Sequence, residues 1–293
     1  MINLRQLEVF YAVMRAGSVT EAARLLNVTQ PAVSAVLKQL ESRLHMKLFD
    51  RAGGRIRPTP EAKALLPDLA EIFGRVGALE RFSLDLAGGA RGMLSIAATS
   101  PLCDGYVAKA VASFVAKRPG IKVSLQSLAS PLVLDRVINR EVDAGVVYEP
   151  VVSAAVQTEE LTRVAIGVIM PARHALAKRR SVRARDLVGH PLVTYLPQAL
   201  LRPFIDRALQ GLDAPLTISV ETGTSATAVM LAVHGAGLAL VESALVSARP
   251  VAGFVMRPIE PRIELRALLL RPRQAAESRL LDAFVAHLRR TFP

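Results

Sequence analysis

The segment that most constrains this chain runs from Ser18 to Arg51, close to its start. It holds two short stretches in which apolar residues recur at helical spacing, with a tight connection between them and a basic loop after them. Two helices joined in this way can set the second one into the major groove of duplex DNA. The segment therefore predicts a helix-turn-helix.

Local signals define the first of these helices. Ser18 stands just before the apolar run and Glu21 follows three residues later, which is the spacing of a capping box at a helix start. Ala22 and Ala23 are small, so a second helix can cross closely over them. Asn27 ends the apolar pattern, and the helix is expected to be short.

The second helix is expected to begin at Thr29, an N-cap residue, with Pro31 in the first turn, where its missing N–H costs nothing. Its buried face comprises Val33, Val36, Leu37, Leu40 and Leu44. The opposite face carries side chains that can bond base edges or phosphates. We predict DNA contacts from Ser18, Thr20, Thr29, Gln30, Pro31, Ser34 and Lys38.

A glycine-containing loop with three arginines, residues 51–57, follows these helices. Its glycines allow a tight hairpin, and Arg51 and Arg55 are placed to reach the DNA backbone or a narrow minor groove. The loop is interpreted as the wing of a winged helix-turn-helix. The alternative is a helical bundle with a solvated basic loop.

This region resembles the N-terminal domain of LysR-type transcriptional regulators. The matching residues are Leu4-Arg5-Gln6-Leu7, Phe10, Gly17-Ser18-Val19-Thr20, Ala22-Ala23, Leu26, Val28 to Ser34, Leu40-Glu41 and Leu48 to Arg51. Length and layout extend the resemblance over the whole chain, more weakly beyond residue 90. One departure follows the wing, where Lys63 replaces a small residue of the family pattern.

The resemblance implies an α/β protein with three parts. Residues 1–58 are the winged helix-turn-helix DNA-binding domain, and 59–87 are a linker (dimerisation) helix. Residues 88–293 are an effector-binding regulatory domain of two subdomains, similar to a periplasmic binding protein. The implied subdomain I covers about 91–162 and 267–293, and subdomain II about 163–266.

Charge and composition agree with this interpretation. The formal net charge is +12, and nine basic side chains face four acidic ones up to residue 60. Such an excess is the electrostatic footprint of a polyanion binder, although a solvated basic surface gives the same signal. The 51% hydrophobic content is enough for a large core. No signal peptide or membrane-spanning run is visible, so a cytoplasmic protein without membrane contact is expected.

Residues 59–87 predict one long helix. Thr59 caps it, Pro60 takes the first helical position, and apolar residues recur at spacings of three and four. About 27 residues give a helix of roughly 40 Å, which Pro67 is expected to kink. An apolar stripe of this length needs a partner. In the family the partner is another subunit, which implies a homodimer or homotetramer; the alternative is packing on its own domain.

A hinge is expected at residues 88–92, Gly-Gly-Ala-Arg-Gly. Beyond it, short β-branched runs alternate with helical periods, which indicates an α/β arrangement with mainly parallel strands. The family fold places two crossing strands near Leu161–Ala165 and Arg262–Leu268, and a last helix, Gln274 to Arg290, that returns to the first subdomain.

Hydroxyl side chains follow three of the predicted strands, where open α/β sheets bind ligands at helix N-termini. Together they suit a carboxylate, and in the family effectors lie between the subdomains. The alternative is that they only cap helices. The expected effector-binding residues are Thr99, Ser100, Pro101, Ser130, Tyr195, Leu196, Thr222, Gly223 and Thr224.

One stretch, Thr194–Asp206, resembles a branch of the family that senses opines and related amino-acid derivatives. The effector is therefore expected to be an amino-acid derivative or another carboxylate. Arg202 in this stretch either faces a ligand carboxylate or is an ordinary surface arginine.

Catalytic signatures are missing from the sequence. The five histidines are scattered without metal-ligand spacing, and neither a phosphate-binding loop nor a Gly-x-Ser-x-Gly elbow is present. Cys103 is the one cysteine, so no intrachain disulfide forms; it is either structural or a redox sensor without a resolving partner. We expect no enzyme, cofactor or metal site.

The sequence thus predicts a sequence-specific DNA-binding regulator of the LysR type, controlled by a small anionic metabolite bound between the subdomains. Expected partners are double-stranded DNA, the effector, further copies of the chain and RNA polymerase. The alternatives are an architectural or ligand-independent DNA-binding repressor with a degenerate pocket, and a pure solute-binding protein.

Overall fold

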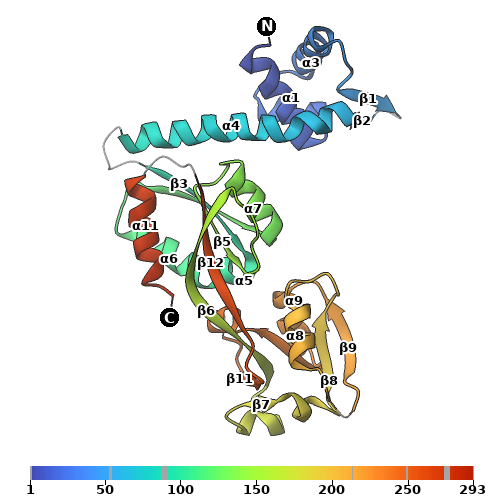
Figure 1. Cartoon of the computed structure of the whole chain (residues 1–293), viewed down its shortest axis with the longest axis vertical. Coiled ribbons are helices and arrows are strands. Elements are labelled where there is room, and N and C mark those ends of the chain that lie inside the picture. The colour runs from blue at the N-terminus through green and yellow to red at the C-terminus, as the bar shows by residue number, and fades with distance from the viewer. Residues whose placement is uncertain are drawn as a thin grey trace. The chain divides into compact units, whose positions relative to one another are not determined.

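The computed structural model describes residues 2–52, 55–86, 92–212, 214–248, 250–273 and 278–292. The chain divides into two compact units (Figure 1). The first consists of Met1–Arg81 with Ile138–Val142, and the second of Phe82–Val137 with Asp143–Pro293. The expected hinge at 88–92 lies outside the described residues except for Gly92.

The first unit is a winged helix-turn-helix followed by one long helix, which confirms the predicted fold class at this end of the chain. Its elements are α1 (Leu4–Ala16), α2 (Val19–Leu25), α3 (Gln30–Leu44), β1 (Phe49–Ala52), β2 (Arg55–Pro58) and α4 (Pro60–Leu86). The strands pair antiparallel as a hairpin. A core made by α1, α2, α3, β1 and the start of α4 includes Phe10, Val33, Leu40 and Leu48.

Of two expected side-chain caps, one forms in part and the other does not form. The Ser18 hydroxyl accepts from the Glu21 N–H at 3.4 Å, but the Glu21 carboxylate bonds Arg24 instead of completing a capping box. Thr29 is the N-cap of α3, yet its hydroxyl makes no capping bond. Pro31 gives a physical reason, because at the second helical position it removes one of the two N–H groups that a cap accepts from.

The long helix α4 begins as predicted. Thr59 is buried, and its hydroxyl accepts from the Ala62 N–H at 3.2 Å. Helical structure continues through Pro67 to Leu86 without a break. Ile72 and Leu79 expose 39% and 64% of their surface, so part of the apolar stripe is uncovered within this chain.

The second unit alternates strands and helices. Its strands are β3 (Met93–Thr99), β4 (Lys122–Leu128), β5 (Ala144–Tyr148), β6 (Val156–Pro171), β7 (Val182–Arg183), β8 (Pro191–Tyr195), β9 (Thr217–Thr222), β10 (Leu238–Glu242), β11 (Phe254–Glu260) and β12 (Glu264–Pro272). Its helices are α5 (Ser100–Leu102), α6 (Ala108–Ala116), α7 (Ser130–Ile138), α8 (Arg202–Ala208), α9 (Ser225–Val233), α10 (Ser243–Ala248) and α11 (Arg279–Arg289). A π-helical turn, Cys103–Val107, joins α5 to α6.

The sheet has two halves joined by two long strands. Its order is β4-β3-β5-β12-β6-β10-β8-β9. We call β3, β4 and β5 with α5, α6, α7 and α11 the first lobe, and β8, β9 and β10 with α8, α9 and α10 the second lobe. Figure 1 shows β6 and β12 running side by side between these groups.

Strand directions correct one expectation. Within each lobe the strands pair parallel, but β12 with β5, β12 with β6, and β6 with both β10 and β11 pair antiparallel. The sheet is therefore mixed rather than mainly parallel, because the chain crosses between the lobes in both directions. The crossings agree with the expected positions, since β6 contains Leu161–Ala165 and β12 begins at Glu264.

The last helix is shorter than expected. It begins at Arg279, where the Ser278 hydroxyl accepts from the Leu281 N–H at 3.2 Å, and not at Gln274. Residues 274–277 lie outside the described part of the chain. Phe284 and Leu288 of α11 pack into the core of the second unit. The helix thus covers the first lobe, as Figure 1 shows.

Gly237 is the tightest backbone position in the turn between α9 and β10. Its φ is +143°, and a Cβ there would lie 2.3 Å from the Pro191 carbonyl oxygen. We expect Gly237→Ala to lower the free energy of unfolding by about 2–4 kcal/mol through strain and overlap. The matched control is Gly189→Ala, with φ +81° and open space around it. It should cost about 1–2 kcal/mol. Urea unfolding followed by circular dichroism measures the free energy of unfolding of each variant. Equal decreases in the two variants would contradict a steric overlap with the Pro191 carbonyl.

Candidate functional site

The helix α3 is fixed on one side by the core, which leaves its other side free. Val33, Leu37 and Leu40 are buried, and the helix crosses Ala22 and Ala23, which expose 0% and 4% of their surface. The small residues thus play the packing role that the sequence predicted. The face away from them is available to a ligand.

That free face carries a row of polar side chains. Gln30, Pro31 and Lys38 are exposed and Ser34 is half-buried. The Gln30 Nε2 donates to the Ser34 Oγ at 3.1 Å. An amide, a hydroxyl and an ammonium therefore follow one another along successive turns, which is the set of groups that reads base edges and neutralises phosphate.

The other residues expected to meet DNA lie at the starts of α2 and α3. Thr20 and Thr29 are exposed. Ser18 is half-buried, and its oxygen already accepts the capping bond from the α2 backbone. A serine in this state can still donate its hydroxyl hydrogen to a phosphate.

The hairpin is held against α3 by Glu41, a residue that the sequence marked only as part of the family match. Its Oε1 accepts from the backbone N–H groups of Leu48 and Phe49 at 2.9 and 3.3 Å. Its Oε2 lies 3.3 Å from the Lys47 Nζ. Charged acceptors make the stronger hydrogen bonds of a protein, so Glu41 fixes where β1 begins relative to α3.

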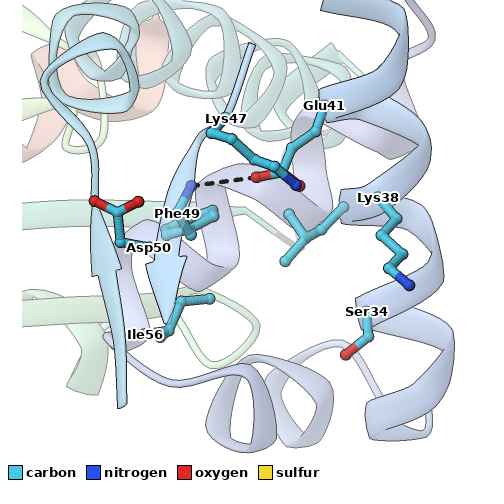
Figure 2. Close-up of a pocket in the computed structure, with 8 residues that line it drawn as sticks. Ser34, Lys38, Glu41, Lys47, Phe49, Asp50 and Ile56 are labelled. Atoms are coloured by element: carbon cyan, nitrogen blue, oxygen red, sulfur yellow. Dashed lines mark hydrogen bonds and ion pairs between the residues drawn. The ribbon is translucent and has the colours of Figure 1, made fainter. Parts of the chain in front are cut away.

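A pocket of about 300 Å³ lies between α3 and the hairpin (Figure 2). Its lining residues are Ser34, Leu37, Lys38, Glu41, Lys47, Phe49, Asp50 and Ile56. Figure 2 shows Ser34 and Lys38 on the helical side and Phe49, Asp50 and Ile56 on the strand side. The free face of α3 and the hairpin therefore border one concave surface.

The wing arginines are only partly described. The backbone of Arg51 lies in β1 and pairs with Ile56, and that of Arg55 lies in β2 and pairs with Ala52. Their side chains are outside the described part of the structure. Their predicted contact with DNA stays a prediction.

Removing the Glu41 clamp should loosen the hairpin. We expect Glu41→Ala to lower the free energy of unfolding of the first unit by about 1–3 kcal/mol, because two partly buried N–H groups lose their acceptor. The control is Glu71→Ala, which removes an exposed ion pair with Arg75 on α4 and should cost less than about 1 kcal/mol. The amide hydrogen-exchange rates of Leu48 and Phe49 should rise in Glu41→Ala. Unchanged rates would argue against a role of Glu41 in holding the hairpin.

In the first lobe, the expected ligand-binding residues follow the ends of two neighbouring strands, β3 and β4. Thr99 ends β3 and pairs in register with Leu128, the last residue of β4. Ser100 is exposed, and its Oγ accepts from the Ser127 Oγ at 2.9 Å. Ser130 begins α7 just beyond. Parallel pairing thus brings Thr99, Ser100 with Pro101, and Ser130 to neighbouring strand ends.

In the second lobe, Tyr195 and Thr222 are paired residues at the ends of β8 and β9. The Leu196 backbone N–H donates to the Thr222 backbone carbonyl oxygen at 3.0 Å. Gly223 and Thr224 follow and are exposed. The Thr224 hydroxyl accepts from the Thr227 N–H at 3.2 Å, so it caps α9, the ordinary role considered for these residues.

Arg202 bonds groups of its own lobe. Its guanidinium pairs with Asp206 and Glu221 at 2.8 and 2.7 Å and donates to the Tyr195 carbonyl oxygen at 2.5 Å. These ion pairs raise the pKa of Arg202 above its ordinary value. The carboxylates that it faces are therefore internal, and Arg202 holds the end of β8 in place.

A buried polar cluster in the second unit was not predicted from the sequence. Glu242, the last residue of β10, exposes 2% of its surface, and Tyr148 and Tyr195 expose 1% each. The Tyr195 hydroxyl donates to the Ser225 Oγ at 3.0 Å. The signal that could have revealed this cluster is a glutamate that directly follows the apolar run Leu238–Val241.

Burial dominates the electrostatics of this cluster. It raises the pKa of the Glu242 carboxyl, and hydrogen bonding to Ser225 opposes the rise. Burial, and then repulsion from Glu242, raise the pKa of Tyr148 and of Tyr195 well above the ordinary value. The environment thus disfavours a negative charge at all three groups.

Three further observations concern the described residues. They contain no group of three or more His, Cys, Asp or Glu side chains arranged to hold a metal ion. Cys103 is buried and unpaired by a disulfide, and burial raises the pKa of its thiol. No described helix has both the length and the apolar character that a membrane span requires.

Two family models match the chain. Residues 4–63 match the bacterial regulatory helix-turn-helix protein model of the lysR family, and residues 87–293 match the LysR substrate binding domain. The regulatory protein NocR of Agrobacterium fabrum is 29% identical over 98% of this chain and 96% of its own length. The octopine catabolism/uptake operon regulatory protein OccR of Rhizobium meliloti is 31% identical over 97% and 94%.

A solved structure shares the whole fold. Full-length CbnR in complex with its target DNA aligns with a TM-score of 0.71 at 20% identity, over 99% of this chain and all of its own. At 20% sequence identity, this similarity is evidence for a shared fold.

Proposed function

The chain belongs to the LysR family of transcriptional regulators and binds DNA, and we propose that a small anionic metabolite controls it. The proposal assigns DNA binding to residues 1–58, subunit pairing to the linker helix at 59–87, and metabolite binding to residues 88–293. The observation that carries the DNA-reading part is the row Gln30, Ser34 and Lys38 on the free face of α3.

In the proposed complex, Gln30 and Ser34 meet base edges in the major groove and Lys38 neutralises a phosphate. Pro31 meets the major groove beside Gln30. Ser18, Thr20 and Thr29 lie at the helix starts and contact the DNA backbone, and Arg51 and Arg55 reach the backbone or the minor groove from the wing. The relative CbnR is known in complex with its target DNA, which supports this mode of binding. The excess of basic residues supports it as well.

The proposed effector site lies at the strand ends of the two lobes. Thr99, Ser100, Pro101 and Ser130 supply hydroxyls and helix N-termini from the first lobe, and Tyr195, Leu196, Thr222, Gly223 and Thr224 line it from the second. Helix N-termini attract anions, which favours a carboxylate. OccR is named for octopine catabolism and uptake, which supports an amino-acid derivative.

Regulation follows as a shift between two arrangements of the subunits. The uncovered apolar residues of α4, Ile72 and Leu79, support pairing with a second copy into a homodimer or homotetramer. An effector changes the balance only if it binds one arrangement better than the other. Contact with RNA polymerase belongs to the same proposal.

The double variant Gln30→Ala, Ser34→Ala should lose sequence preference and keep salt-sensitive binding to duplex DNA, because base contacts specify and phosphate contacts position. Selection of bound fragments from genomic DNA measures the preference. The matched control is Ser42→Ala, which removes an exposed hydroxyl near the end of the same helix. An unchanged motif in the double variant would refute the assignment of these residues.

The effector site is tested by a thermal-shift screen of the full chain against amino acids, opine-like conjugates, aromatic acids and central metabolites. A ligand that binds the native state raises the unfolding midpoint by mass action. Ser100→Ala should reduce that rise. The control Ser113→Ala removes a hydroxyl that bonds its own helix α6 and His287. Equal rises in wild type and Ser100→Ala would place the ligand elsewhere, and a blank screen of folded protein would favour a ligand-independent repressor.

A further inference from the structure

One short segment from the regulatory part of the sequence belongs to the DNA-binding unit. Residues 138–142 connect α7 to β5, yet they form part of the first compact unit together with Met1–Arg81. The segment supplies an acid, Glu141, whose side chain exposes only 16% of its surface. A carboxylate held against a unit that binds a polyanion calls for a physical reason, because like charges repel.

Two side chains of α1 hold this carboxylate. The Tyr11 hydroxyl donates to the Glu141 Oε1 at 3.0 Å, and the Arg15 Nη1 lies 3.4 Å from the Glu141 Oε2. Burial, and then the charge of Glu141, raise the pKa of Tyr11, so its hydroxyl stays a hydrogen-bond donor. The Tyr11 ring stacks on Phe73 of α4, with ring centroids 5.2 Å apart. The binding place of Glu141 is therefore built by α1 and α4 together.

Gly74 allows the segment to lie directly on α4. This residue is buried in the interior of the helix, where glycine is less favourable than any residue except proline. A Cβ at this position would overlap the Asn139 carbonyl oxygen and lie 2.7 Å from the Asn139 carbonyl carbon. The next residue, Arg140, has a φ of +57°, which residues other than glycine rarely adopt. Both features are locally unfavourable, and the packing of the segment on α4 offsets them.

Arg15 stands close in the chain to residues that are proposed to contact DNA. Helix α1 ends one residue later, Gly17 caps it, and Ser18 is the N-cap of α2. Ser18 and Thr20 are assigned to the DNA backbone above. Arg15 exposes 46% of its side chain, so a further partner can reach it. Guanidinium groups bind phosphate and carboxylate with the same geometry. Glu141 therefore holds a group that suits a DNA phosphate.

We propose that Arg15 is a further contact to the DNA backbone and that Glu141 masks it. In the closed arrangement, residues 138–142 lie on α4 and Glu141 neutralises Arg15. In the open arrangement the segment leaves α4, and Arg15 pairs with a phosphate. The closed arrangement binds DNA more weakly, because it holds a negative charge against α1 and withholds one cation. This inference rests on the proposed mode of DNA binding and adds an internal competitor to it.

The test measures the Kd of the full chain for a fluorescent duplex of random sequence, about 30 base pairs long, by anisotropy between about 50 and about 200 mM sodium chloride. Gly74→Ala prevents the closed arrangement and leaves the net charge unchanged, and alanine favours the helix. It should bind about threefold tighter than wild type or more at about 100 mM salt. The slope of log Kd against log salt should steepen by about 0.9 or more, as expected for one more phosphate contact.

Three further variants guard the result. Glu141→Gln should tighten binding in the same direction, and it tests the inference independently if sedimentation velocity shows that Gly74→Ala alters subunit pairing. Gly77→Ala makes the same exchange elsewhere on α4 and should bind as wild type does. Glu159→Gln removes an acid that pairs with Arg289 at 2.6 Å, and it should leave the Kd unchanged. The last control separates the mask from a general effect of net charge.

Arg15→Gln identifies the group that is released. It should weaken DNA binding about threefold more in the Gly74→Ala background than in wild type, because the wild-type chain already withholds this side chain. In the double variant the steeper salt dependence of Gly74→Ala should return to the wild-type slope.

The inference is overturned if Gly74→Ala and Glu141→Gln bind the duplex as their controls do. It is also overturned if the gain persists in the Arg15→Gln background, because Arg15 is then not the group that meets phosphate. Failure of the proposed DNA-reading face looks different. There, the Gln30→Ala, Ser34→Ala variant would keep its sequence motif, while the gain in Gly74→Ala still depended on Arg15.

Discussion

The antiparallel pairing of β6 with β12 is the constraint on which the regulatory domain depends. Both strands pass from one lobe to the other, and their register runs from Val156 with Pro272 to Ala165 with Glu264. Each lobe then builds its parallel strands on one end of this pair, β5 on β12 and β10 on β6. The ends of β5 and β10 are therefore placed by the same two strands, which fixes Tyr148 and Glu242 relative to each other.

A second, local constraint orders the DNA-binding unit. Glu41 lies on α3 but uses its hydrogen-bonding capacity on the first residues of the hairpin and on Lys47. Thr59 links the hairpin to α4. Its hydroxyl donates to the Lys47 carbonyl oxygen at 2.9 Å and accepts from the Ala62 N–H of α4. The hairpin is thus tied to the helix before it and to the helix after it by two side chains, Glu41 and Thr59, that are not among the residues proposed to contact DNA.

Sequence patterns predicted the elements that depend on short-range chemistry. Helical spacing and small residues indicated the helix-turn-helix, since Ala22 and Ala23 are buried where α3 crosses. β-Branched runs alternating with helical periods indicated the α/β arrangement that follows residue 92. Sequence patterns failed to predict strands whose hydrogen-bonding partners lie far away in the sequence. The first half of β6 reads as polar, Gln-Thr-Glu-Glu, and is a strand because β12 pairs with it.

The sequence by itself determined the family, the order of a helix-turn-helix, a long helix and an α/β domain, and the polar row on α3, because these depend on residues a few positions apart. Tertiary structure decided the use of each side chain. In the folded chain the Thr224 hydroxyl caps a helix, and Arg202 pairs with carboxylates of its own lobe. Glu242 is buried at the end of an apolar strand. The physical reason is that burial and hydrogen-bond partners are properties of the assembled sheet, set by residues that are far apart in the chain.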